Sequence, residues 1–333
     1  MILVTGAAGH IGNVLVRQLT ARGEHVRALI LPGEDTSALD GVPVEMVPGN
    51  ILDFPILRQA VRGVTTVFHL ASLVSLMEEH APILRRVNVD GTQNVIRACM
   101  EEGVNRLVYT SSIHALQRPP LGEVIDEQLA FDCINPAGPY DRTKAQASVL
   151  VRNAVQQGLS AVILCPTGVI GPYDYRRSEM GAMILDWMGR SVNFLVAGTF
   201  DFVDVRDVAQ AHIAAAERGR SGETYILGGE RIAVPQMRRM VQTISGAAGI
   251  AWELPEKFAM ACAWAAEWYY RLSRTRPRFT RYSLETIFSN SNILSAKAAR
   301  ELDHRPINLA QSLQDTIAWW LENRQRGIAS VRI

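Results

Sequence analysis

Apolar runs and amphipathic segments alternate along the first half of the chain. Apolar runs of strand length stand at 1–4, 25–31, 44–47, 66–70, 106–110 and 160–164. Segments with the apolar spacing of helices lie between them, at 13–19, 55–62, 83–101 and 140–156. The first of these helices is expected to end near Gly23. Strands and helices that alternate at short spacing pair as a parallel sheet with helices on both faces. The pattern therefore predicts an α/β fold with a doubly wound parallel sheet.

The alternation loosens beyond about residue 167. A helix is predicted over 203–218, a strand over 224–227, and mainly helices over 256–325. We expect residues 1–166 to form the sheet domain, with segments around 200–230 returning to it. Residues 167–325 are expected to form mainly a smaller, largely helical lobe, and 326–333 a tail.

A glycine-rich turn follows the first predicted strand. Thr5–Gly12 reads TGAAGHIG and leads into the first predicted helix. Amides at a helix N-terminus behind such a turn hold a pyrophosphate. Gly6 permits the tight turn, Gly9 the approach of the phosphates, and Gly12 close packing of the helix on the strand. The alternative is a glycine-rich turn without a ligand; the motif itself predicts a Rossmann dinucleotide-binding domain.

Composition excludes several classes of protein. The 333 residues include 34 basic and 33 acidic side chains, a net charge of +1, which gives no electrostatic case for nucleic acid or an anionic membrane surface. The four cysteines (Cys99, Cys133, Cys165 and Cys262) are widely spaced, so we expect reduced thiols and no metal site. We expect no signal peptide, because the first strand starts at Ile2, and no membrane span. These features are typical of a soluble, cytoplasmic protein.

Tyr140 and Lys144 stand four residues apart in a predicted helix, so their side chains project from one face. A neighbouring ammonium and a positively charged nicotinamide would both favour the phenolate and lower the pKa of the tyrosine from about 10. Ser111 and Ser112 end the strand predicted at 106–110, where ligands bind in open α/β sheets. Ser112 is thus placed to bond a substrate oxygen beside Tyr140. The alternatives are an ordinary surface helix and a pair of loop-capping serines.

Several further segments, taken together, carry a family resemblance. They are Thr5–Gly12, Val67–Ala71, Asn88–Thr92, Tyr109–Ser112, Tyr140–Lys144, Pro166–Pro172, Phe202–Ala209, Tyr225–Gly229 and Asp315–Trp320. In this order and spacing the chain resembles the extended short-chain dehydrogenases/reductases (the NAD-dependent epimerase/dehydratase family) over nearly its whole length. It is most similar to the branch of dihydroflavonol 4-reductase-like, 3β-hydroxysteroid dehydrogenase-like and hopanoid-associated epimerase-like proteins.

The resemblance implies a role for each matching residue. Tyr140 would be the acid/base, Lys144 would contact the nicotinamide ribose and lower the tyrosine pKa, and Ser112 would polarise the reacting oxygen. The residues implied to bind the cofactor are Gly6, Gly9, His10, Ile11, Gly12, Asn50, Ile51, Leu70, Ala71, Asn88, Tyr140, Lys144, Pro166, Thr167 and Val169. His69 would line the same cleft or be a core histidine, and Asn88 would serve a local hydrogen-bond network or a purely structural role.

The usual markers of cofactor choice are missing. An acid that holds the adenosine ribose would stand at Ile30, and the arginine of NADP-dependent relatives at Leu31. A 2′-phosphate without a cation loses charge-assisted hydrogen bonds, so NAD is favoured over NADP; Arg27 or a loop residue is the alternative. Asn50 replaces the aspartate that often faces adenine in the family, and an amide still serves that contact.

The substrate is expected in the smaller lobe. Residues 256–273 carry an apolar stripe that includes Phe258, Trp264 and Trp268, read as core packing, with a lipophilic substrate wall or a membrane contact as alternatives. A cluster of arginines follows, at 271, 274, 276, 278 and 281. It is interpreted as a solvated face, with a site for a phosphate, a carboxylate or a pyrophosphate as the alternative.

Three functions remain open from the sequence. The preferred one is an oxidoreductase that interconverts a secondary alcohol and a ketone on an apolar or ring-containing small molecule. A nucleotide-sugar epimerase or dehydratase with tightly held NAD is the second, and a catalytically silent cofactor-binding protein the third. Analogy with relatives also suggests a homodimer through helices 83–101 and 140–156, supported by apolar Val95, Val149 and Val151.

Overall fold

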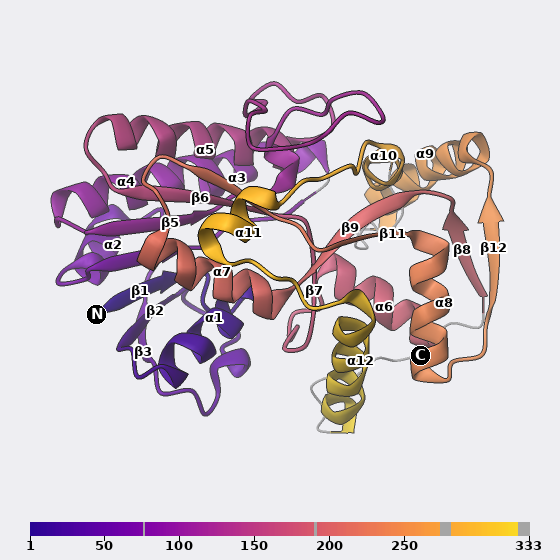
Figure 1. Cartoon of the computed structure of the whole chain (residues 1–333), viewed down its shortest axis with the longest axis horizontal. Coiled ribbons are helices and arrows are strands. Elements are labelled where there is room, and N and C mark those ends of the chain that lie inside the picture. The colour runs from indigo at the N-terminus through magenta and orange to yellow at the C-terminus, as the bar shows by residue number, and fades with distance from the viewer. Residues whose placement is uncertain (76, 190–191, 274–280, 326–333) are drawn as a thin grey trace.

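A seven-stranded, fully parallel sheet organises the first part of the molecule (Figure 1). The computed structural model describes residues 1–75, 77–189, 192–273 and 281–325. The strand order is β10-β6-β5-β4-β1-β2-β3. The strands are β1 (Ile2–Thr5), β2 (Val26–Ile30), β3 (Glu45–Pro48), β4 (Thr66–His69), β5 (Arg106–Thr110), β6 (Ala161–Pro166) and β10 (Thr224–Leu227). Every predicted strand is therefore present, and none of the strand ends is shifted by more than two residues.

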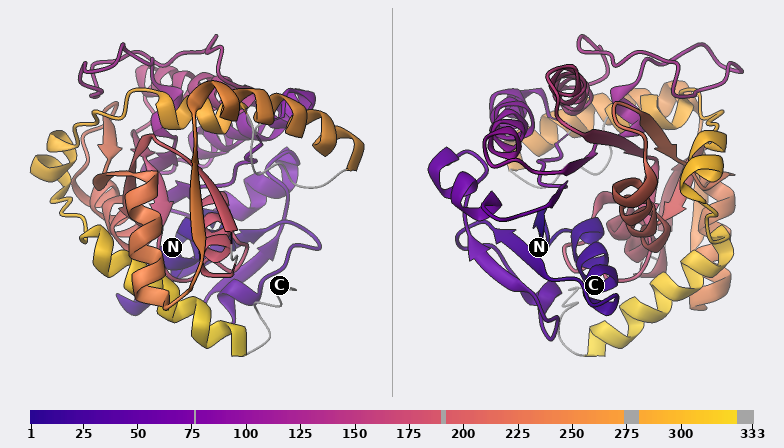
Figure 2. Two further views of the ribbon diagram at one scale, coloured as in Figure 1. Left: turned by 90° about the vertical axis from the view of Figure 1, so that its right-hand side faces the viewer. Right: turned by 60° about the vertical axis from the view of Figure 1, so that its left-hand side comes forward.

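Helices cover both faces of this sheet (Figures 1 and 2). One core cluster lies between the sheet and α1 (His10–Ala21), α7 (Val205–Arg218) and α11 (Ala296–Leu302). A second lies between the opposite face and α2 (Phe54–Val61), α4 (Gly91–Glu101) and α5 (Pro139–Gln156). The prediction of a doubly wound Rossmann sheet is confirmed.

Three predicted helices differ from the structure by two or more residues in their bounds. The helix expected over 13–19 is longer, since α1 extends from His10 to Ala21. The helix expected over 83–101 is divided into α3 (Ala81–Leu84), a π-helical turn (Arg85–Asp90) and α4. Asn88 in this turn bonds both the N–H and the C=O of Leu73, so a tertiary contact coincides with the wider turn. The helix expected from 203 begins at Val205, because the two preceding residues belong to a strand.

The rest of the chain forms a lobe beside the sheet (Figure 1). Its helices are α6 (Glu179–Gly189), α8 (Val234–Ser245), α9 (Glu256–Ser273), α10 (Arg281–Phe288) and α12 (Leu309–Gln325). Two small sheets were not predicted: β11 (Glu230–Ala233), β9 (Thr199–Asp204) and β7 (Gly168–Ile170) form one, and β12 (Ile250–Leu254) and β8 (Val192–Val196) the other. The lobe is mainly helical, as predicted. The expected tail at 326–333 lies outside the described residues.

The apolar stripe of α9 is only partly core. Ala259 and Ala263 are buried, whereas the Phe258 and Trp264 side chains are 58% and 57% exposed. The core interpretation is wrong for these two aromatics, because the small alanines occupy the packed face. The Trp268 side chain and most of the arginine cluster lie outside the described residues. Among the described helices, none has the length and apolar character needed to cross a membrane.

Candidate active site

The glycine-rich turn leaves β1 and ends at the N-terminus of α1. Gly6 has a φ of +71°, and a Cβ there would lie 2.7 Å from the Ala71 nitrogen. A Cβ on Gly12 would overlap the Gly6 carbonyl oxygen. Gly9 is the N-cap of α1, which has neither a side-chain cap nor an acidic residue in its first turn. This turn therefore leaves amides at a positive helix end open to an anion, which fits a dinucleotide pyrophosphate.

A segment at 171–178 crosses over the start of α1. His10 Nε2 donates to the Pro172 carbonyl across 3.0 Å, and the Asn13 amide donates to the Tyr173 carbonyl across 3.1 Å. The buried Asp174 carboxylate accepts from the Ser178 amide and hydroxyl. We call residues 171–178 the strap. The side chain of His10 therefore joins the strap to the glycine-rich turn.

The other residues expected to contact a cofactor follow strand ends near this turn. Leu70 and Ala71 come directly after β4, and their amides donate to the Thr5 carbonyl and hydroxyl. Pro166, Thr167 and Val169 lie where the chain passes from β6 to β7.

Asn50 and Ile51 follow β3. The Asn50 carbonyl oxygen Oδ1 accepts from the Leu52 amide across 2.9 Å, and Ile51 is buried in the core. Asn50 therefore holds its own turn, which leaves its Nδ2 amide as the group available for adenine.

His69 is a core histidine in the structure. It is fully buried, and its ring nitrogens lie 2.7 Å from Thr5 Oγ1 and 3.0 Å from Thr92 Oγ1. Burial, with a smaller contribution from Lys144, lowers the pKa of His69 to about 3, so its ring is neutral. Asn88 bonds Leu73 and donates to Thr143 Oγ1 across 3.1 Å. Both residues thus stabilise the framework behind the site.

Ser112, Tyr140 and Lys144 all lie near the carboxyl end of β5. The Tyr140 hydroxyl is within hydrogen-bonding reach of the Ser112 side chain. Lys144 is buried; its Nζ donates to the Thr110 carbonyl across 2.5 Å and lies 4.7 Å from the centre of the Tyr109 ring. Ser112 Oγ also accepts from the His114 amide, so the predicted loop cap and the contact with Tyr140 coexist.

Burial dominates the protonation of this group. It raises the pKa of Tyr140 to about 12, against a lowering by the hydrogen bond to Ser112. It lowers the pKa of Lys144 to about 7. In the protein alone the tyrosine pKa thus moves opposite to the lowering expected from a lysine and a nicotinamide. Any activation of Tyr140 has to overcome the desolvation of its phenolate.

Five side chains around Ser112 and the start of α5 were not singled out from the sequence. Asp141 is fully buried and accepts from Arg118 across 2.8 Å and from the Tyr282 hydroxyl across 2.5 Å. The His114 ring stacks on Phe200, with centroids 5.8 Å apart, and meets Tyr282 edge-on at 6.2 Å. His114 stands two residues after Ser112, which is the one signal that the sequence offered. Tyr282 and Phe200 come from the lobe, and no local sequence pattern predicts that they pack beside His114.

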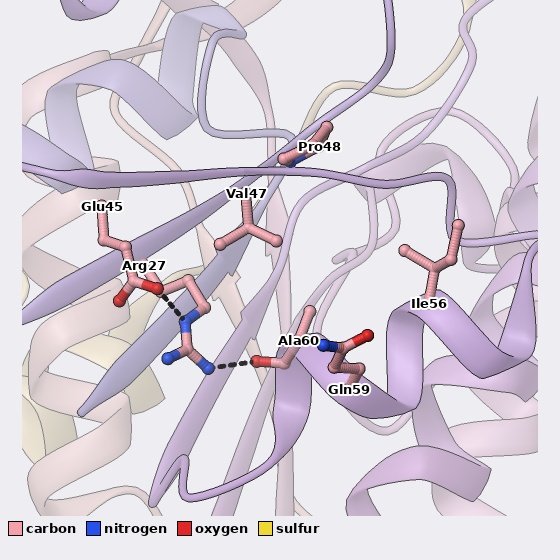
Figure 3. A pocket seen from close by; sticks show the side chains of 7 residues that line it. All are labelled: Arg27, Glu45, Val47, Pro48, Ile56, Gln59 and Ala60. Atoms are coloured by element: carbon pink, nitrogen blue, oxygen red, sulfur yellow. Dashed lines mark hydrogen bonds and ion pairs between the residues drawn. The ribbon is translucent and has the colours of Figure 1, made fainter.

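The cavity of Figure 3 lies away from this chemistry. It measures about 420 Å³ and is bounded by β2, β3 and α2. Arg27 on its wall is already paired: Nε donates to Glu45 across 3.0 Å and Nη1 to the Ala60 carbonyl across 2.8 Å. Arg27 is therefore no free partner for a cofactor phosphate.

A second cavity, of about 460 Å³, lies closer to Tyr140. Arg118, Asn135, Pro136, Ala137 and Glu285 are among its lining residues. Among the described residues, no group of three or more His, Cys, Asp or Glu side chains is placed to hold a metal ion.

Comparisons with known proteins agree with this fold. The model of the NAD dependent epimerase/dehydratase family matches residues 2–228. "Sterol demethylase protein B" of Methylococcus capsulatus is 34% identical, in an alignment that covers 98% of this chain and 99% of that protein. A "putative dihydroflavonol 4-reductase" of Synechocystis is 30% identical, in an alignment that covers 95% of this chain and 93% of that protein. The crystal structure of gox2253 matches at a TM-score of 0.86, with 33% identity and 99% of both chains covered.

Proposed function

The chain belongs to the NAD-dependent epimerase/dehydratase family, and on that premise we propose that it interconverts a secondary alcohol and a ketone on an apolar or ring-containing small molecule. It is an enzyme of the extended short-chain type, with relatives named as reductases. The observation that carries the proposal is the placement of Ser112, Tyr140 and Lys144 near the carboxyl end of β5.

Each of the three side chains has a distinct task in the proposed reaction. In the reductive direction Tyr140 gives its proton to the substrate oxygen, and in the oxidative direction it takes that proton back. Ser112 donates a hydrogen bond to the same oxygen and stabilises the charge that develops on it. Lys144, whose Nζ is fixed by the Thr110 carbonyl, is proposed to stabilise the phenolate with its positive charge and to bond the nicotinamide ribose.

The glycine-rich turn is the proposed seat of the cofactor. The open amides of α1 would hold the pyrophosphate, and the ends of β4 and β6 would border the rest of the cleft. NAD, when bound, accepts or returns the hydride of the alcohol carbon. The residues of this chain orient that cofactor, exclude water and move the proton at the substrate oxygen.

Aromatic side chains next to Ser112 support a ring-containing substrate. His114, two residues beyond Ser112, stacks on Phe200 and meets Tyr282 edge-on. The lowered pKa of His114, which burial causes, keeps this ring neutral and hence suited to an uncharged ligand. The name of the Methylococcus relative, a sterol demethylase protein, points in the same direction.

The test is a screen of ketones and secondary alcohols with NADH and NAD, followed by product analysis. Stoichiometric consumption of the nicotinamide cofactor is expected with an apolar cyclic substrate. The second candidate, an epimerase or dehydratase, is named by the family itself. Conversion of a nucleotide sugar with no net change in NADH would establish that candidate instead and refute the oxidoreductase.

A cytoplasmic homodimer remains part of the proposal, by analogy with relatives. The helical region 83–101 and α5 would form the interface. Val95 and Val151 do not support it, because both are fully buried in the core of their own chain. Ile83 and Met100, which are exposed, are the apolar residues available there. A monomeric mass by light scattering at micromolar concentration would refute the dimer.

A further inference from the structure

The loop after β2 borders the proposed cofactor cleft. β1 and β2 are parallel neighbours, with Thr5 opposite Leu29, so the glycine-rich turn and the residues after Ile30 leave the same edge of the sheet. In dinucleotide-binding folds of this kind the adenosine ribose reaches from the glycine turn to the end of the second strand. Side chains fixed at this edge therefore meet the ribose.

Glu34 returns to this edge although it stands four residues beyond Ile30. Its Oε2 accepts from the Leu31 amide across 2.9 Å, and the Glu34 amide donates to the Leu31 carbonyl across 2.9 Å. Gly33, with a φ of +81°, permits the tight turn between them. The Glu34 side chain is only 15% exposed. The loop thus holds a carboxylate at the position where the sequence has no acid.

A cation from the strap is bound to this carboxylate. Arg176 lies 2.7 Å from Glu34 Oε1 and also donates to the Asp35 carbonyl across 3.0 Å. The strap itself is anchored on α1 through His10 and Asn13. The Arg176 guanidinium is therefore kept at the same edge, with Glu34 as its partner.

Arg17 on α1 and Arg27 in β2 are bound by other groups. Arg17 donates to the Ala38 carbonyl across 2.7 Å, and its guanidinium lies 5.1 Å from the centre of the Tyr173 ring. Arg27 is bound to Glu45 and the Ala60 carbonyl. Arg176 is thus a cation held at this edge that a phosphate on the ribose could recruit, and its ion pair with Glu34 competes with such a phosphate.

We propose that Glu34 makes this enzyme select NAD over NADP, by accepting a hydrogen bond from the adenosine ribose and by keeping Arg176 from a 2′-phosphate. The inference rests on the proposed binding of the dinucleotide at the glycine-rich turn. A carboxylate accepts from a ribose hydroxyl and repels a phosphate, whereas a released arginine binds a phosphate through two parallel hydrogen bonds. One residue therefore acts on both cofactors in opposite directions.

The experiment compares the affinities of NADH and NADPH by nicotinamide fluorescence titration of the full-length protein. Wild type is expected to prefer NADH by about tenfold or more, and Glu34→Gln to bind NADH more weakly and NADPH about tenfold more tightly. The double variant Glu34→Gln/Arg176→Gln should lose that gain in NADPH affinity. Glu45→Gln is the matched control, since Glu45 also pairs with an arginine beside β2 but away from this edge; its cofactor ratio should stay that of wild type.

Each outcome bears on the proposal. An unchanged ratio of affinities in Glu34→Gln, or a gain that persists without Arg176, would overturn it. Should Glu34→Gln fail to fold by circular dichroism, Arg176→Gln alone decides: Glu34 then stands without its counter-ion, so NADPH must bind more weakly than to wild type while NADH does not. Failure of wild type to bind either dinucleotide would refute the proposed function as well, whereas binding without turnover would refute the proposed function alone.

Discussion

The Tyr282 hydroxyl donates to Asp141 Oδ1 across 2.5 Å, and so joins α10 of the lobe to the helix that carries Tyr140 and Lys144. Arg118 binds the other oxygen of the same carboxylate. The N-terminal turn of α5 is therefore held from two sides. Asp141, the residue after the proposed acid/base, is the point where both contacts meet.

Removal of this contact should loosen the lobe from α5. Tyr282→Phe is expected to lower the free energy of unfolding by about 1.5–3 kcal/mol, because the carboxylate loses a hydrogen bond where little water replaces it. Urea denaturation followed by circular dichroism measures the loss. Tyr175→Phe is the control, since the Tyr175 ring packs on Trp319. Equal stability of Tyr282→Phe and the control would contradict the role given to this contact.

Tyr140→Phe should remove turnover and leave cofactor binding nearly unchanged. Phenylalanine keeps the ring but lacks the oxygen that exchanges a proton with the substrate. We expect the rate to fall by about 100-fold or more, in the range of positioned acid–base catalysis. Steady-state kinetics across about pH 6–10, a range chosen around the ordinary tyrosine pKa, test this together with NADH titration. Near-parental turnover in the variant would end the assignment of Tyr140 as the acid/base.

Lys144→Ala should affect both measurements. Its ammonium is proposed to touch the ribose as well as the phenol, so turnover and NADH affinity should both fall. The pH profile of turnover separates this role from a structural one. The part of the profile that reports the ionisation of Tyr140 should move to higher pH in the variant, because the positive charge that favours the phenolate is gone. An unchanged profile, with NADH affinity also unchanged, would show that Lys144 acts only through packing.

Gly9→Asp should abolish dinucleotide binding. The new carboxylate would stand at the N-cap of α1, bond its open amides and repel a pyrophosphate. Gly189→Asp is the control, because Gly189 has open space around its Cα. NADH titration of both variants, with circular dichroism to confirm the fold, gives the result. Unchanged affinity in Gly9→Asp would refute the phosphate-binding turn.

The buried histidines should destabilise the protein as the pH falls below their ordinary pKa. Burial lowers the pKa of His212 to about 4 and that of His69 to about 3, from an ordinary value of 6.5. Between pH 6.5 and 4 the unfolded chain binds these protons and the folded chain does not, so the free energy of unfolding falls as pH falls. Each histidine contributes at most about 1.4 kcal/mol per pH unit.

The contribution of one histidine can be isolated. His212→Gln should reduce the slope of stability against pH between 6.5 and 4, as measured by urea denaturation at a series of pH values. The glutamine keeps a partner for Thr110, whose hydroxyl lies 2.7 Å from the His212 ring. An identical slope in the variant and the parent would show that the histidine gains its proton in both states.

The parts of the fold that the sequence predicted are those dictated by local patterns. The sheet strands are continuous apolar runs, and Gly6 and Gly12 are where a side chain would collide with neighbouring backbone. The Tyr140–Lys144 pair follows from helix geometry alone. These features need no knowledge of distant contacts, which is why one sequence suffices.

What the sequence left open depends on tertiary contacts. The π-helical turn at Arg85–Asp90 coincides with bonds from Asn88 to Leu73, and α9 packs through Ala259 and Ala263 while larger apolar side chains face outwards. Glu34 was not predicted as a ribose ligand because it stands beyond the end of β2 in the sequence, and only its side chain folds back to that strand end. In each case the contact is made with a residue distant in the sequence, or it depends on the conformation of a side chain.

The path of the chain between sheet and lobe has a consequence for modularity. After β6 it enters the lobe, returns through α7 and β10, leaves again at β11, and comes back once more through α11. A fragment ending at residue 166 would lack the helix that packs on α1 and the strand that pairs with β6. Neither half is thus expected to fold when it is expressed without the other, so truncation at the apparent boundary should cost the whole enzyme.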